Sequence, residues 1–151
     1  MLFRSSRAVG LPHEDGATPA ARHQKIADVY PWGDEFPPPK GAGNYMGTGD
    51  ADPNIPNLLE IQGYQDDHTH TAPVGRYKPN VLGIYDLGGN AWEWVEDWFD
   101  ETQIDRTLRG GSWMFTFERD FLSSSRHHSV PGTRLDYFGF RVVIDPGTPA
   151  R

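Results

Sequence analysis

The stretch NVLGIYDLGGNAWEWVEDW, residues 80–98, decides how this chain folds. It contains three of the chain's five tryptophans and a Gly-Gly-Asn turn signal at residues 88–90. Burying one indole removes roughly 150–250 Å² from water, so three indoles this close together indicate a packed centre and not a surface loop. Asp86 and Glu93 flank the turn, and we expect each to need a partner, because an unpaired buried charge is very costly.

The composition around this stretch predicts a loop-rich protein. The chain has 151 residues, which is the length of one domain, with 17 glycines, 13 prolines and 13% aromatic residues. This mixture indicates short strands joined by turns, with helix as the minor element, and hence an α+β fold of low regular secondary structure. The chain has no cysteine, which excludes disulfides, thiolate metal sites and thiol nucleophiles in it.

The charge and hydropathy exclude two classes of partner. A formal net charge of −7 repels phosphate backbones, so we expect no nucleic-acid binding. Divalent cations are more suitable ligands for a chain with this charge. No apolar run approaches the roughly 20 residues of a membrane span, and no signal peptide is recognisable at the start. The chain as written is expected to be cytoplasmic and not to bind a membrane.

Along the chain, the pattern predicts an N-terminal arm, one domain and a short tail. Residues 1–29 are polar, with a short helix expected over 18–29, and residues 146–151 read as a tail. The domain spans 30–145. Its clearest strands are predicted at 108–113 and 138–144, with a hairpin-like connection at 99–107.

Three motifs, in order, carry a family resemblance: GIYDLGGNAWEW at 83–94, LRGGSW at 108–113 and GFRV at 139–142. They closely resemble the formylglycine-generating enzyme (sulfatase-modifying factor) family, whose fold is a relative of the C-type lectin fold. Residues 8–12 and 30–33 match motifs that lie midway through the family domain. The resemblance therefore covers the C-terminal half of that domain, which implies an N-terminally truncated fold. Whether a partner covers the missing half is left open by the sequence.

The central stretch is also a candidate calcium site. The carboxylates of Asp86 and Glu93 and the carbonyls of Gly89 and Ala91 offer four of the roughly 6–8 oxygens that calcium takes. The alternative is that Asp86 caps the turn while Glu93 pairs with an arginine such as Arg109 or Arg141. The resemblance favours calcium, because family members bind it through residues that match these four positions.

The resemblance implies a second calcium site elsewhere. It would use the Asn44 side chain, the Tyr45 carbonyl, the Asp66 side chain and the His68 carbonyl. From the sequence alone, the Asp-Asp pair at 66–67 is typical of a solvated turn. A zinc or copper site at His68 and His70 is a weaker hypothesis, because two histidines without a third ligand are more typical of a surface loop.

The segment 114–126 bears on catalysis. In active members of the family, two cysteines in this segment bind copper and oxidise a substrate cysteine, and the matching positions here are Phe115 and Asp120. Neither side chain binds copper(I) as a thiolate, so copper is not expected. A serine triad built on Ser123–Ser125 is disfavoured as well, because no nucleophile-elbow sequence surrounds these serines.

What remains in this region is a candidate ligand surface of aromatic, histidine and acidic residues. The alternative for each aromatic residue is ordinary core packing. The predicted ligand contacts are Phe115, Phe117, Asp120, Phe121, His127, His128, Leu135, Asp136 and Tyr137. We expect a non-catalytic, calcium-stabilised, lectin-like domain that binds a protein or peptide. A divergent or fragmentary family oxidoreductase, or a binding protein diversified by a retroelement, is the alternative.

Overall fold

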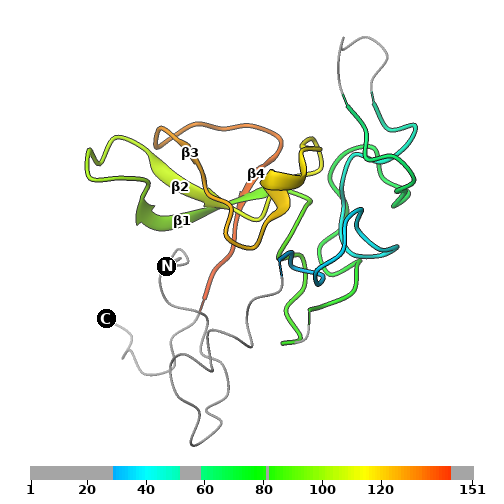
Figure 1. The fold of residues 1–151 in the computed structure, drawn as a ribbon. Coiled ribbons are helices and arrows are strands. Elements are labelled where there is room, and N and C mark those ends of the chain that lie inside the picture. The colour runs from blue at the N-terminus through cyan, green and yellow to red at the C-terminus, as the bar shows by residue number, and fades with distance from the viewer. Residues whose placement is uncertain (1–28, 52–58, 81, 144–151) are drawn as a thin grey trace, which may run out of the picture.

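The computed structural model describes residues 29–51, 59–80 and 82–143 (Figure 1). Within them, regular structure is limited to four short strands and one turn of 3-10 helix. These elements are β1 (Trp92–Trp98), β2 (Arg106–Arg109), η1 (Glu118–Phe121), β3 (His127–Ser129) and β4 (Phe138–Phe140). The expected low regularity is confirmed, because glycine and proline interrupt almost every apolar run.

The four strands form one sheet in the order β3-β2-β1-β4. Strands β1 and β2 pair antiparallel, with Trp94 opposite Leu108, and the predicted hairpin connection lies between them. Strand β4 returns parallel to β1 and places Phe138 beside Trp92. The motif at 139–142 is thereby brought next to the central stretch at residues 80–98.

Two strand predictions need correction at their ends. The strand expected over 108–113 is instead β2, which ends at Arg109, because Gly110 and Gly111 adopt φ values of +93° and +76° that do not continue a strand. The second prediction began correctly at Phe138, but β4 ends at Phe140. Strand β1 was not predicted from the sequence, and its pairing is irregular between Trp94 and Trp98.

Aromatic rings form the core that joins the loops to the sheet region. The buried cluster consists of Tyr30, Tyr45, Ile61, Tyr64 and Phe121. Tyr45 packs edge-on against Phe121, with ring centroids 4.8 Å apart, and against Tyr64 at 5.7 Å. Figure 1 shows the sheet on one side and the cyan and green loop segments on the other, with η1 between them. Phe121 of η1 thus connects the two parts.

Several predictions fall outside the described residues. These are the arm at 1–29 apart from its last residue, the helix over 18–29 apart from the same residue, and the tail at 146–151. Among the described residues, no helix is long and apolar enough to cross a membrane.

Candidate functional site

The two acidic residues of the central stretch are joined by an arginine. Arg141 donates to both carboxylate oxygens of Glu93, at 2.7 Å from Nη2 and 3.0 Å from Nε, and Nη2 also donates to the main-chain oxygen of Asp86 at 2.8 Å. Hydrogen bonding with Glu93 raises the pKa of Arg141. Of the two sequence interpretations of Glu93, the structure shows the pairing with Arg141.

The calcium site expected at residues 86–93 stays a prediction. In the described structure the guanidinium of Arg141 supplies a positive charge to Glu93, so a cation bound there would compete with this ion pair. Asp86 accepts a hydrogen bond from the Gly75 amide on one oxygen, at 2.6 Å, while Oδ1 is buried without a partner. Of the four carboxylate oxygens of Asp86 and Glu93, Asp86 Oδ1 is thus the one without a hydrogen-bond partner in the described structure.

The second predicted site differs, because its residues do come together around a buried carboxylate. Asp66 is 7% exposed and accepts hydrogen bonds from the Tyr45 amide at 2.7 Å and from the His68 amide at 2.9 Å. No ion pair to Asp66 occurs in the described part of the chain. Burial raises the pKa of the Asp66 carboxyl group. A cation would therefore lower the cost of burying this charge.

Asn44, the neighbour of Tyr45, supplies a further oxygen. Its Nδ2 donates to the carbonyl of His70 at 2.6 Å and to Oδ1 of Asn90 at 3.2 Å, which fixes the amide plane. Its Oδ1 is buried and has no hydrogen-bond partner. Asn44 precedes Tyr45, whose amide donates to Asp66, and calcium takes both amide and carboxylate oxygens.

A transition-metal site on the histidines is not supported. Among the described residues, there is no cluster of three or more His, Cys, Asp or Glu side chains that could hold a metal ion. The ring of His70 packs on Trp113, with centroids 4.8 Å apart, and His68 faces Tyr77 at 6.5 Å. These histidines belong to the packing around the loops.

The profile of the sulfatase-modifying factor enzyme 1-like domain family matches residues 4–146. The chain belongs to this family. It is 30% identical over 152 residues to the formylglycine-generating enzyme of Streptomyces coelicolor, an alignment that covers 89% of this chain and 46% of the relative. It is 31% identical over 158 residues to the bovine inactive C-alpha-formylglycine-generating enzyme 2, covering 95% and 46%.

A solved structure agrees with this membership. PvdO from Pseudomonas aeruginosa is 27% identical and superposes with a TM-score of 0.52 over 76% of this chain and 43% of its own. The chain spans about half the length of the curated relatives it matches. The formylglycine-generating-enzyme-like fold is therefore shown.

Phe115 and Asp120, which the resemblance predicts to match the copper-binding cysteines of the family, lie in different surroundings. The ring of Phe115 lies edge-on to Trp92, with centroids 5.5 Å apart, and contacts His127 at 5.9 Å and Tyr137 at 6.0 Å. Asp120 lies in η1, where burial raises the pKa of its carboxyl group. Phe115 thus contacts three residues that lie far apart in this chain, Trp92, His127 and Tyr137.

The residues of the predicted ligand surface divide by exposure. Phe117 and Leu135 are 50% and 42% exposed, and His128 and Asp136 are exposed as well. The half-buried members are Phe115, Asp120, His127 and Tyr137. Phe121 requires a correction, because it is 1% exposed and belongs to the core.

Two of the histidines and the serines take part in structural contacts. His128 Nδ1 lies 2.6 Å from a carboxylate oxygen of Asp105, and its ring packs on Phe99 at 4.2 Å. Burial lowers the pKa of His127, whose ring lies 5.2 Å from that of Trp92. The carbonyls of Ser123–Ser125 accept hydrogen bonds from Arg109. Arg109, the other candidate partner of Glu93, therefore holds this loop instead.

Sequence reasoning missed the residues that position η1. The Tyr30 hydroxyl donates to Glu118, which raises the pKa of Tyr30 to about 12, and the Ser123 amide donates to the Val29 carbonyl at 2.8 Å. Trp32 stacks on Tyr30 with centroids 4.8 Å apart and an interplanar angle of 4°. The available signal was the pair of aromatic residues in the Tyr-Pro-Trp-Gly run at 30–33, whose proline and glycine predict only extended and turning backbone.

Proposed function

We propose that this chain is a non-catalytic domain of the formylglycine-generating enzyme family. It binds a protein or peptide on the surface formed by residues 114–138, and calcium bound at Asn44 and Asp66 stabilises it. The observation that carries the proposal is the packing of Phe115, whose ring lies against Trp92, His127 and Tyr137 where catalytic relatives are expected to have a copper thiolate.

The chemistry of the two positions supports the absence of cysteine oxidation. Copper(I) prefers soft sulfur ligands, and a phenyl ring and a carboxylate supply none. Oxidation through a mixed disulfide needs a thiolate at the enzyme, and this chain has no cysteine at all. Among its relatives, the bovine and mouse proteins named as inactive C-alpha-formylglycine-generating enzyme 2 are both 31% identical to it.

The contacts of Phe115 also support a ligand surface. They bring residues of the 114–117 loop, β3 and the 135–138 segment to one place. Around them, Phe117 and Leu135 expose apolar side chains, and Arg119 lies 4.9 Å over the Phe117 ring. Rigid rings with adjacent charged groups are the composition from which peptide-binding surfaces are built.

The calcium role is supported by the uncompensated Asp66 carboxylate and the unsatisfied Asn44 oxygen. Calcium there would connect residues 44–45 to the loop at 66–68. In the structure these two segments are joined by the hydrogen bond from the Tyr45 amide to Asp66. Its contribution would be to stability and not to a reaction. The proposed function does not include copper binding.

An activity assay in the presence of copper tests the proposal that the chain is not catalytic. Purified chain, copper, oxygen and a cysteine peptide of the sulfatase type are incubated, with an active formylglycine-generating enzyme as positive control. We expect no aldehyde by mass spectrometry. Aldehyde formation would instead establish the alternative, a divergent or fragmentary oxidoreductase of the family.

Copper(I) titration provides a second readout. The double variant Phe115→Cys and Asp120→Cys is expected to bind copper(I) at least about tenfold more tightly than the parent, since two thiolates replace ligands of low affinity. Equal copper affinity of the two proteins would show that the parent has a copper site of its own and would contradict the proposal.

Peptide selection tests the ligand surface. Peptides enriched from a displayed random library are measured against the parent protein, Phe117→Ala and Leu135→Ala, with Ile104→Ala as matched control, because Ile104 is 64% exposed and lies outside the surface. We expect the first two variants to lose at least about fivefold in affinity and the control to lose nothing. Failure to enrich any peptide, or equal binding by all variants, would overturn the proposal that residues 114–138 bind a peptide.

A further inference from the structure

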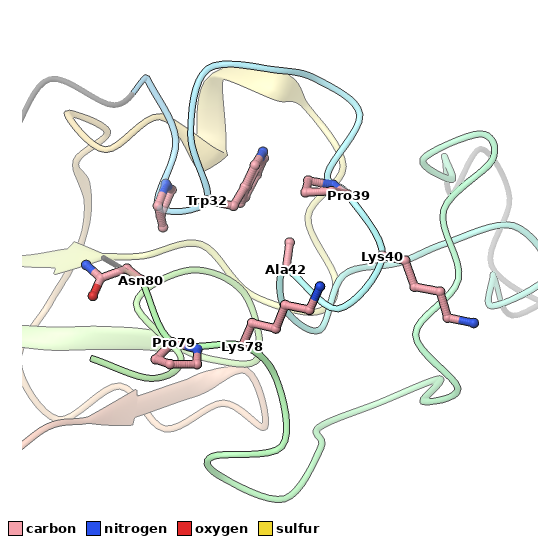
Figure 2. A pocket seen from close by; sticks show the side chains of 8 residues that line it. Trp32, Pro39, Lys40, Ala42, Lys78, Pro79 and Asn80 are labelled. Atoms are coloured by element: carbon pink, nitrogen blue, oxygen red, sulfur yellow. The ribbon is translucent and has the colours of Figure 1, made fainter. Parts of the chain in front are cut away.

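A hollow of about 180 Å³ lies on the loop side of the molecule, outside the predicted calcium sites and the predicted ligand surface. Figure 2 shows the side chains that surround it. They come from two segments, 31–42 and 78–80. The lining residues are Pro31, Trp32, Pro39, Lys40, Ala42, Lys78, Pro79 and Asn80.

The walls of this hollow are rigid. Three of the lining residues are prolines, whose φ angles are fixed by the ring. Trp32 is held by its stacking on Tyr30 and by a hydrogen bond of 2.8 Å from its Nε1 to the Glu35 carbonyl. The two segments are joined by a hydrogen bond from the Lys78 amide to the Gly41 carbonyl, at 3.0 Å. A ligand would therefore meet a site that is already formed, which lowers the entropic cost of binding.

The charge of this hollow is opposite to that of the protein. Two of the chain's three lysines, Lys40 and Lys78, line it, and no acidic residue does, although the chain carries a net charge of −7. Neither lysine forms an ion pair within the described ranges. The site thus offers positive charge that nothing in the described structure neutralises.

The two lysines are not equivalent. Figure 2 shows the side chain of Lys78 running past Ala42 along the hollow, whereas that of Lys40 points away from Trp32. The Lys78 stem also lies against Gly41, with Cε 3.7 Å from where a Cβ of that residue would be. Lys78 is therefore the cation placed to meet a ligand, and Lys40 contributes charge at the rim.

The size and lining together define the ligand. At about 180 Å³ the hollow is smaller than the roughly 300–1,000 Å³ typical of pockets for drug-sized ligands, so it suits a small molecule such as one ring with one small polar group. An indole and three prolines suit a flat apolar body, and an ammonium group suits a carboxylate. We propose that this hollow binds an aromatic carboxylate, with the ring against Trp32 and the prolines and the carboxylate on Lys78.

This site is independent of the proposed peptide surface and of calcium, and each can fail without the other. Its test uses phenylacetate as probe, followed by NMR through the side-chain N–H signal of Trp32, which a Trp32→Phe variant assigns. We expect saturable shifts with a Kd on the order of 1 mM, the range of small fragments. Phenylacetamide, which lacks the charge, and acetate, which lacks the ring, are each expected to bind at least about fivefold more weakly.

Charge variants locate the carboxylate. Lys78→Gln is expected to weaken phenylacetate binding at least about fivefold, Lys78→Arg to restore it, and Lys40→Gln to weaken it by less than Lys78→Gln. The matched control is Arg134→Gln, which removes an exposed positive charge outside the hollow and should leave the Kd unchanged. Equal binding of phenylacetate and phenylacetamide, an unchanged Kd in Lys78→Gln, or no saturation of the Trp32 signal would overturn the proposal.

Discussion

Arg141 binds both carboxylate oxygens of Glu93, 48 residues earlier in the chain, at 2.7 and 3.0 Å. The two side chains are 25% and 22% exposed, so the pair lies between a solvated surface bridge and a buried one. It joins β1 to the segment that follows β4, and it extends to the Asp86 carbonyl at the turn before β1. A two-point ion pair of this kind fixes geometry as well as adding energy.

The first prediction concerns this pair. We expect Arg141→Met and Glu93→Gln each to destabilise the protein, with a coupling free energy of about 1–2 kcal/mol in a double-mutant cycle followed by urea unfolding. Arg134→Met serves as control, because Arg134 is exposed, and should change stability by less than about 0.5 kcal/mol. A coupling near zero would show that solvent already screens the pair.

The second prediction is that calcium raises the melting temperature through Asp66. At a calcium concentration 100 times the Kd, binding stabilises the native state by about 2.7 kcal/mol, or about 5–10 °C for a chain of this size. Asp66→Asn should abolish the rise. Asp67→Asn is the matched control, because Asp67 is the exposed neighbour and should leave the rise intact. A rise that survives in Asp66→Asn but disappears in Glu93→Gln would place the ion at residues 86–93 instead.

The sequence predicted the family fold but only part of the candidate site. The glycine and proline content and the tryptophans at 92–98 were sufficient for a loop-rich fold with an aromatic centre. Strand β1 was not recognisable, because its pairing is irregular between Trp94 and Trp98 and its buried positions, Trp92 and Val95, do not alternate with period two. The pairing of Glu93 with Arg141 could be proposed only as one of two alternatives, since the partner is brought close by the parallel return of β4.

The third prediction separates two phenylalanines that the sequence could not distinguish. Phe117 and Phe121 lie four residues apart around η1, but Phe121 packs on Tyr45, which comes from a segment more than 70 residues away. Phe121→Ala should cost about 3–5 kcal/mol of unfolding free energy, because it leaves a cavity in the core. Phe117→Ala should cost less than about 0.5 kcal/mol, because its ring is half exposed. Similar losses from the two substitutions would contradict the core assignment.

The fourth prediction follows from the pKa of Asp66, which burial raises above its usual 3.8. Between 3.8 and the raised value, the folded protein binds more protons than the unfolded chain, so the contribution of Asp66 to stability falls as pH rises through this window. In the absence of calcium, the parent should therefore lose stability relative to Asp66→Asn as pH rises from 3.8 towards neutral. Calcium should reverse the difference at neutral pH. Parallel stability curves for the two proteins from pH 4 to 7 would refute the assignment.

The fifth prediction concerns the turn that opens the central stretch. Gly89 adopts φ +76°, and a Cβ there would lie 2.4 Å from the Asn44 carbonyl oxygen and 2.6 Å from the Tyr45 ring. Gly63 has nearly the same conformation, φ +80°, but open space where its Cβ would be. Replacing either glycine should therefore cost about 1–2 kcal/mol of unfolding free energy for the backbone conformation alone. The two positions differ only in the atoms that surround them.

Gly63→Ala should accordingly lower the unfolding free energy by about 1–2 kcal/mol, and Gly89→Ala by at least about 2 kcal/mol more, since the contacted atoms are backbone and a buried ring that cannot move aside. The same displacement would move Asn44, so Gly89→Ala should also weaken the stabilisation by calcium, whereas Gly63→Ala should leave it unchanged. The main-chain N–H of Asn90 at this turn donates to the Asn44 carbonyl at 2.9 Å, so we expect a displacement of the turn to reach the proposed calcium ligand Asn44. Equal losses of unfolding free energy for the two substitutions would contradict the role assigned to the packing around Gly89.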